Sequence, residues 1–141
     1  MILSQLNWIA VAVCAIVYFG IGGMWYSPML FAKPWMAGHG ISMPSTDEEK
    51  AKARKGMGQL MAITFLMGFV GVIALDYMET AMYAKNWMTG AKCGIVASVF
   101  ACLAMGLNYM YTRKSMKIYI IDVGYHVVSL VIVGIVLSIW K

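Results

Sequence analysis

Residues Ile118 to Ser129 read Ile-Tyr-Ile-Ile-Asp-Val-Gly-Tyr-His-Val-Val-Ser, and they open an apolar run that continues to Trp140. A run of this length can cross a bilayer, which takes about 20 residues of helix. It nevertheless carries four polar side chains, namely Asp122, Tyr125, His126 and Ser129. Their spacing of three, four and seven places them on one face of a helix. An acid in a span costs about 2.5–3.5 kcal/mol on insertion scales, so we expect this polar stripe to face the interior of a bundle.

The composition of the chain indicates an integral membrane protein. Of the 141 residues, 62% are hydrophobic and only 12% are charged, whereas about a quarter are charged in soluble domains. The net charge of +5 comes from short loops, where Lys and Arg set membrane topology, so we expect no nucleic-acid partner. The three cysteines lie in or beside apolar segments without a CxxC motif, which favours packing over metal or redox chemistry.

The hydropathy pattern predicts an all-α bundle of four transmembrane helices in a single domain, residues 1–141. The expected spans are about residues 6–26, 58–75, 90–111 and 118–140. After the first span, Ser27 and Pro28 form a plausible helix start, and Pro34 limits that helix to a turn or two. We expect this short segment to lie along the membrane surface.

The segment before the second span contains a helix-start pattern. Ser45 and Thr46 precede three acids, Asp47, Glu48 and Glu49, which satisfies the capping-box pattern in either register. We expect one continuous helix from about Thr46 to Met78, with its first turns forming a cytoplasmic extension. Asp76 and Glu79 lie close to the next loop, so we expect them at the membrane interface. His39, in the preceding link, is expected to be a solvated loop residue.

The third span contains a ladder of small residues spaced by four, Gly90, Gly94, Ser98, Cys102 and Gly106. Small-xxx-small spacing lets helix backbones approach closely in lipid. The ladder therefore predicts a packing face. Its partner could belong to the same chain or to a second copy.

The distribution of positive charge predicts the orientation in the membrane. The first and third loops hold eight basic residues, Lys33, Lys50, Lys52, Arg54, Lys55, Arg113, Lys114 and Lys117. The opposite side holds three, Lys85, Lys92 and Lys141. Because Lys and Arg concentrate in cytoplasmic loops, both termini are expected outside the cytoplasm.

That orientation brings polar residues of several spans to one level. The first span ends and the third span closes on the cytoplasmic side, where the polar stripe of the fourth span begins. From Lys117, Asp122 lies about 7 Å deep and His126 about 14 Å on helix rise alone. We therefore predict a polar cluster of Asp122, Tyr125, His126, Ser129, Asn108, Trp25, Tyr26 and Ser27.

Two motifs, Trp25–Trp35 (WYSPMLFAKPW) and Gly124–Leu130 (GYHVVSL), resemble the hallmarks of a family of small bacterial four-helix membrane proteins. The family is catalogued as domain of unknown function number seventeen sixty-one. This chain has Ala32 where the family pattern is expected to have Gly, and Pro34 after Lys33. The resemblance implies the four-helix architecture and supports six motif positions, Trp25, Tyr26, Ser27, Pro28, Tyr125 and His126. For a bacterial protein of this class we expect a location in the inner membrane. The resemblance implies no reaction, ligand or partner.

Four classes of function remain open from the sequence. We rank first a non-enzymatic structural or accessory component, as a homo-oligomer or as a subunit of a larger membrane complex. The alternative is a transporter of a small solute, an ion or a proton-linked substrate that uses Asp122 and His126. The same residues could instead form a structural clasp, in which Asp122 pairs with His126, Tyr26, Asn108 or a loop cation, and we rank this clasp above transport.

The two remaining classes rank lower. Cu(I) handling by thioethers is ranked below simple packing, although Met57 and Met61 are spaced by four, as are Met78 and Met82. No nucleophile–base pair or phosphate loop is present, so we expect neither an enzyme nor a cofactor or metal.

Overall fold

A computed structural model describes residues 2–140, and every regular element in that range is helical. The elements are η1 (Ile2–Gln5), α1 (Trp8–Trp25), α2 (Ala32–Gly38), α3 (Asp47–Arg54), α4 (Met57–Ala81), α5 (Trp87–Tyr111) and α6 (Met116–Ile139). Four helical segments are long and apolar enough to cross a membrane: α1, α3 with α4, α5, and α6. The predicted all-α fold with four spans is confirmed. Lys141, which counts in the charge asymmetry, lies outside the described residues.

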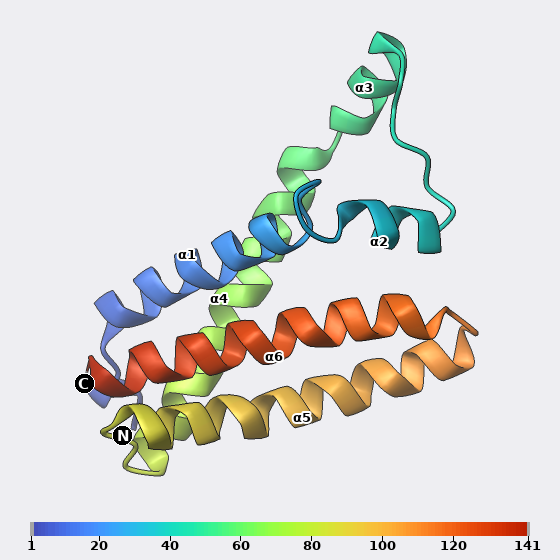
Figure 1. The fold of residues 1–141 in the computed structure, drawn as a ribbon. Coiled ribbons are helices and arrows are strands. Elements are labelled where there is room, and N and C mark those ends of the chain that lie inside the picture. Colours follow the sequence, from blue (N-terminus) through green and yellow to red (C-terminus); the bar gives the residue numbers. More distant parts are fainter. Residues whose placement is uncertain (1, 141) are drawn as a thin grey trace.

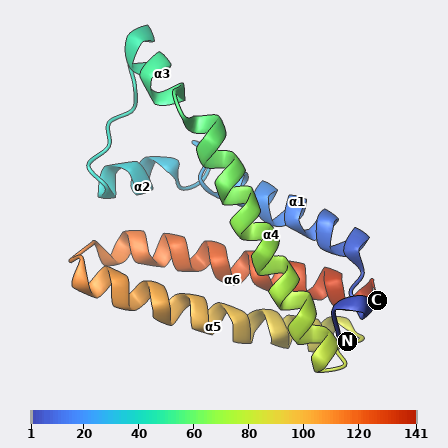
Figure 2. The same ribbon diagram turned by 180° about the vertical axis from the view of Figure 1, so that it is seen from behind.

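The helices form an antiparallel pair with two further helices packed against it. α5 and α6 lie side by side along their whole length, and α1 lies against α6 (Figure 1). α4 crosses this group obliquely, so one half of it packs against the other helices while its first half leads away toward α3 (Figure 2). The two chain ends meet at one end of the bundle (Figure 1). We call this the core end, and we call the opposite end, where α1 ends and α6 begins, the site end.

The apolar core is concentrated at the core end. Its fully buried side chains are Ala10, Val11, Cys14 and Ala15 of α1, Val72 and Leu75 of α4, Ala84 and Cys93 before and in α5, and Val133 and Leu137 of α6. On α4, the buried residues begin only at Val72, and none precedes it in that helix. The site end is therefore held together by contacts other than this apolar core.

Glycines bring α5 and α6 into backbone contact. A Cβ atom added at Gly90 would lie 2.3 Å from the carbonyl oxygen of Gly134, and one added at Gly94 would lie 2.4 Å from that of Leu130. Real Cβ atoms do not approach oxygen so closely, and only glycine allows this spacing. The partner of this part of the ladder is thus α6 of the same chain.

The remaining ladder positions also face inward. Ser98 is buried, and its hydroxyl donates to the carbonyl of Ile95, 2.7 Å away in its own helix. Toward the site end, the Tyr119 hydroxyl of α6 donates to the Cys102 carbonyl at 3.0 Å. A Cβ at Gly106 would lie 3.2 Å from the same hydroxyl oxygen. A tyrosine from α6 fills the space that the small residues leave here.

The helix after the first span begins later than the sequence predicts. Ser27 and Pro28 lie in turns, and α2 starts at Ala32. The backbone N–H groups of Leu30 and Ala32 instead donate to the Ser27 carbonyl at 3.0 and 3.2 Å. Pro34 falls in the first turn of α2, where its missing N–H has no intrahelical partner to lose. The predicted helix start at Ser27 was wrong, and Pro34 opens the helix rather than ending it.

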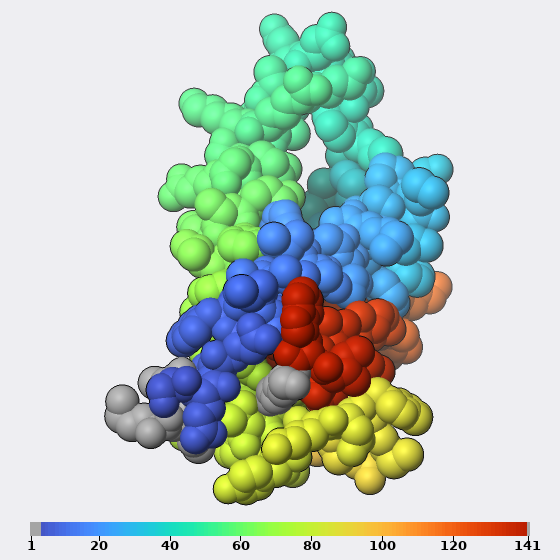
Figure 3. All heavy atoms as spheres, turned by 90° about the vertical axis from the view of Figure 1, so that its left-hand side faces the viewer, coloured from blue at the N-terminus to red at the C-terminus, as the bar shows by residue number. Residues whose placement is uncertain are grey.

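The predicted continuous second helix is interrupted between α3 and α4. Lys55 is extended and Gly56 has a φ of +81°, so the chain turns before Met57. Glycine adopts this left-handed conformation without the steric cost that a Cβ brings. In the space-filling view an opening separates α3 and the start of α4 from α2 (Figure 3).

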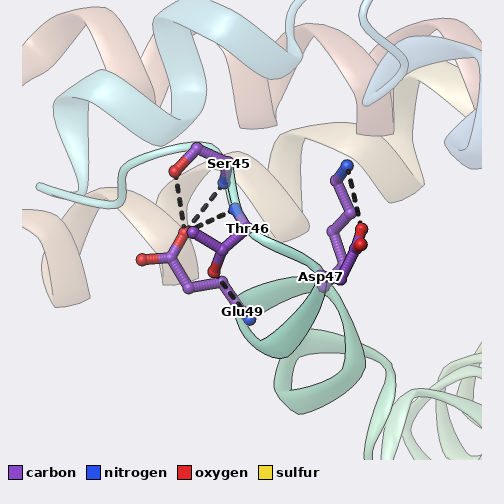
Figure 4. A network of polar contacts seen from close by, with 5 residues as sticks. Ser45, Thr46, Asp47 and Glu49 are labelled. Carbon is purple, nitrogen blue, oxygen red and sulfur yellow. Dashed lines mark hydrogen bonds and ion pairs between the residues drawn. The ribbon is translucent and has the colours of Figure 1, made fainter.

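The start of α3 shows which capping register the chain uses. The Thr46 side chain accepts from the Glu49 backbone N–H at 3.2 Å, and Glu49 Oε2 accepts from the Thr46 N–H, also at 3.2 Å (Figure 4). Ser45 adds two more bonds to the same carboxylate oxygen, and Lys50 pairs with Asp47 at 3.7 Å. This closed network lets the charged helix α3 form outside the bundle, although none of its residues is buried.

A carboxylate and aromatic site at one end of the bundle

Asp122 is the centre of the polar contacts at the site end. It lies in the second turn of α6, about 9 Å along the axis from Met116. Its Oδ1 accepts a hydrogen bond from the Tyr26 hydroxyl at 2.7 Å and another from Trp35 Nε1 at 3.0 Å. Its Oδ2 accepts from the Tyr109 hydroxyl. One half-buried carboxylate thus connects α6 to the end of α1, to α2 and to α5.

Local packing explains why these side chains reach Asp122. The Trp25 indole donates to the Ile121 carbonyl at 3.0 Å, and its ring would meet a Cβ at Gly124 at 3.0 Å. On the facing helix, a Cβ at Gly22 would lie 3.2 Å from the Tyr125 hydroxyl. A glycine on each helix therefore admits an aromatic ring of the other. This close approach of α1 and α6 places Tyr26 beside Asp122.

His126 has its own partner. The Tyr18 hydroxyl and His126 Nδ1 are hydrogen-bonded at 3.1 Å, and the Tyr125 hydroxyl donates to the Tyr18 carbonyl at 3.3 Å. Among the contacts of residues 2–140, no hydrogen bond joins Asp122 to His126. The acid and the imidazole are therefore neighbours on one helix face, each held by different tyrosines.

The aromatic rings around these groups form a continuous row. Ring centroids are 5.4 Å apart for Tyr18 and Tyr125, 5.6 Å for Tyr125 and Tyr26, and 5.7 Å for Tyr26 and Trp35. The row ends at His39, whose ring lies 4.1 Å from that of Trp35. His39 Nδ1 also contacts the Trp35 carbonyl at 2.9 Å, so the residue that was predicted to be a solvated loop residue is half-buried in the turn that ends α2.

Asp122 and His126 line a cavity of about 500 Å³ between α4 and the other helices. One wall is polar and aromatic, formed by Tyr18, Tyr26, Trp35, Asp122, Tyr125 and His126. Thr64, Met67, Gly68 and Gly71 form the α4 wall, and Met105 of α5 and Leu130 of α6 complete the lining. Met67 is 71% exposed, so the cavity opens along its α4 wall.

The structure brings together half of the side chains that the sequence assigned to the polar cluster. Tyr26, Asp122, Tyr125 and His126 lie within one contact network, and Trp25 lies beside it, donating to the Ile121 carbonyl. The other three do not join it. Ser129 donates to the Tyr125 carbonyl of its own helix, and Asn108 is exposed. The Ser27 hydroxyl is buried but has no hydrogen-bond partner among the described residues.

Three members of the network were missed by the sequence reasoning: Tyr18, Trp35 and Tyr109. Tyr18 precedes Trp25 by seven residues, a spacing that places both on one helix face and could have included it. Tyr109 follows Asn108 in the sequence. Which of these two side chains points into the bundle depends on the rotation of α5 about its axis. Trp35 depends on where α2 begins, which the sequence pattern misplaced.

A second pair of acids lies at the core end. Asp76 and Glu79 are both 0% exposed, so the prediction that they are interface residues was wrong. They occupy the last turns of α4, where this helix packs most deeply against its neighbours, and the helix continues past the expected end of the span. Glu79 also borders a cavity of about 280 Å³ with Gln5, Asn7, Thr80, Tyr83, Ala84 and Lys85.

The cavity at the site end offers polar and aromatic contacts to a molecule that enters it. The groups facing the cavity are a carboxylate, an imidazole, hydroxyls and aromatic faces. Within residues 2–140, no three His, Cys, Asp or Glu side chains gather closely enough to hold a metal ion.

The fold and the site together define a multi-pass membrane protein of four spans, with a carboxylate-containing aromatic cavity at one end of the bundle. Residues 9–138 match the family described as protein of unknown function (DUF1761), and the chain belongs to this family. The resemblance seen in the sequence motifs is thereby confirmed. Among curated proteins and solved structures, none matches the chain.

Proposed function

We propose that this protein binds a small solute in the cavity at the site end and carries it across the membrane. The observation that supports this most directly is the position of Asp122 and His126, which both line a cavity of about 500 Å³. Ionisable residues inside a membrane bundle are costly, and they commonly mark the paths of substrates or protons. Ligand pockets in proteins have volumes of about 300–1,000 Å³, so this cavity has room for a small organic molecule.

The small-residue ladder of α5 shifts the balance between the two leading hypotheses. In the sequence it offered an interface for another copy or subunit. In the structure, Gly90 and Gly94 contact the α6 backbone of the same chain. The strongest sequence argument for an oligomeric or accessory role is therefore accounted for within one protomer, whereas the cavity remains to be explained.

The test fills the cavity without disturbing the bundle. A Cβ at Gly71, on the α4 wall, would meet nothing within 4 Å. The same holds for a Cβ at Gly58, which lies near the start of the same helix and outside the cavity lining. Gly71→Leu should block the cavity, and Gly58→Leu is the matched control. Thermal melts in detergent with a panel of cationic, neutral and anionic small molecules report binding, because a ligand stabilises the state that it binds.

We expect at least one class of compound to raise the melting temperature of the wild type and of Gly58→Leu, but not of Gly71→Leu. The same compound should accumulate in proteoliposomes that contain the wild type. If no class stabilises the protein in a Gly71-dependent manner, the cavity is not a solute site and the proposal is wrong.

A second candidate function is an accessory component, either as a homo-oligomer or in a larger membrane complex. It is supported by the first half of α4, where apolar side chains such as Leu60 and Leu66 are 58% and 60% exposed. Lipid or a partner helix could cover this face. Cross-linking in native membranes at Leu60→Cys, followed by purification, should give a discrete adduct if a protein partner covers it, and none if lipid does.

We also propose that the protein resides in the inner membrane of a bacterium, with both termini outside the cytoplasm. The support is the charge asymmetry of eight basic residues in the first and third loops against three on the other side.

A further inference from the structure

We propose that the solute is a lipophilic organic cation. This inference rests on the proposed solute site and adds the class of ligand. It is carried by the charge of the cavity lining, by the aromatic row and by the opening along α4.

The lining carries one acidic side chain and no fixed positive charge. Asp122 is the acid, and no Lys or Arg is among the described residues that line the cavity. Its three hydrogen-bond partners, Tyr26, Trp35 and Tyr109, are uncharged donors. The only ion pair among residues 2–140 joins Lys50 and Asp47, far from this site in α3. The three donors stabilise the half-buried carboxylate but leave its charge without a counter-ion, and a cationic ligand in the cavity would supply one.

The aromatic row is the second argument. Tyr18, Tyr26, Trp35 and Tyr125 line the wall that also carries Asp122. The faces of aromatic rings attract cations, most strongly where water is excluded, and organic ammonium groups are recognised in this way. A wall of aromatic rings beside one carboxylate favours a large, weakly hydrated cation over an inorganic ion, since no three His, Cys, Asp or Glu side chains gather among the described residues.

The opening of the cavity is the third argument. Met67, which is 71% exposed, forms part of the α4 wall, and the first half of α4 leads away from the α5–α6 pair (Figure 2). Such a side opening in a membrane bundle gives access to molecules dissolved in the bilayer. The amine of a lipid headgroup shares the cationic chemistry, but a lipid phosphate would have no basic partner in this lining. The observations therefore favour a free lipophilic cation.

The experiment compares two ions of the same shape and opposite charge, tetraphenylphosphonium and tetraphenylborate. Binding of each to the full-length protein in maltoside detergent is measured by equilibrium dialysis. We expect wild type and Gly58→Leu to bind the phosphonium, and Gly71→Leu to lose that binding. Asp122→Asn keeps an acceptor oxygen but removes the charge, and it should weaken phosphonium binding by about tenfold or more.

Each outcome separates the ligand class from the solute site. If tetraphenylborate or a neutral compound binds with the same dependence on Gly71 while the phosphonium does not, the ligand class is wrong and the solute site stands. If nothing binds in a Gly71-dependent manner, both proposals are wrong. If the melting curve shows that Asp122→Asn is folded, and this variant binds the phosphonium as tightly as the wild type, the carboxylate does not select the cation. If added phosphatidylethanolamine displaces the phosphonium, the lipid headgroup is the occupant and the free cation is not.

Discussion

At the scale of single residues, Asp122 has both a structural and a chemical role. Its two oxygens receive hydrogen bonds from Tyr26, Trp35 and Tyr109, which come from three separate segments of the chain. A hydrogen bond to a charged group contributes about 1.5–3 kcal/mol, and a buried donor left without an acceptor costs about 1–3 kcal/mol. At the site end these bonds add to the packing of the buried side chains Ile118, Ile121 and Ala32.

This arrangement predicts different effects for two substitutions of Asp122. Asp122→Asn keeps one carbonyl oxygen for Tyr26 and Trp35, and its amide can donate to the Tyr109 hydroxyl, so its melting temperature should stay near that of the wild type. Asp122→Leu removes every acceptor and should lower the free energy of unfolding by about 1–3 kcal/mol or more. Thermal melts in one detergent measure both. A Leu variant as stable as the wild type would show that the three donors do not depend on this carboxylate.

The polar stripe of α6 could be predicted from the sequence because it depends only on helical spacing within one segment. The positions 122, 125 and 126 share a face whatever surrounds them. The partners could not be predicted in the same way. Whether Asn108 or Tyr109 faces Asp122 depends on the rotation of α5, and that rotation is set by the contact of Gly90 and Gly94 with α6.

At the scale of secondary-structure elements, the α5–α6 pair is the most tightly packed part of the fold. At Gly94 the nearest atoms are backbone atoms of α6, including the Leu130 oxygen at 2.4 Å from an added Cβ. Backbone cannot move aside as the end of a flexible side chain can. The separation of these two helices is therefore fixed by the absence of a side chain.

Gly94→Leu should consequently force α5 and α6 apart. Overpacking of a close contact costs about 1–3 kcal/mol and sometimes more, so we expect a lower melting temperature or loss of the folded bundle. Gly20→Leu on α1 is the control, because a Cβ there meets nothing within 4 Å, and it should melt like the wild type. Equal melting of both variants in detergent would mean that the α5–α6 contact is looser than the structure places it.

The positions of the spans could be predicted because they follow from runs of apolar residues, but two helix boundaries could not. α2 begins at Ala32 because turns hydrogen-bonded to the Ser27 carbonyl occupy the preceding residues. Gly56 was read as part of a helix, since glycine is compatible with both helix and turn. Asp76 was assigned to the interface by its distance from the loop, whereas its burial depends on how α4 crosses the other helices.

At the scale of the whole molecule, the two ends of the bundle are built differently. The core end is packed by apolar side chains of α1, α4, α5 and α6. The site end contains a cavity bordered by a carboxylate and aromatic rings, and there α4 leads away from the other helices. This asymmetry is what a solute path needs on one side of a membrane, because a packed end closes the bundle while the other stays accessible.

Which side of the membrane the cavity faces depends on the orientation of the chain. The eight basic residues of the first and third loops lie at the site end, since α1 and α5 end there and α3 precedes α4. Because such residues are retained in the cytoplasm, the cavity should be on the cytoplasmic side. A reporter enzyme that is active only in the cytoplasm should be active when inserted in the link of residues 38–44. A reporter that is active only outside the cytoplasm should be active when fused after residue 141.

The control replaces Lys114 and Lys117 by Gln. This leaves six basic residues on the side of the first and third loops, still more than the three on the other side, so the orientation should not invert. A cytoplasmic C-terminus in the wild type would reverse the orientation and place the cavity, with Asp122 in its wall, on the outer side of the membrane.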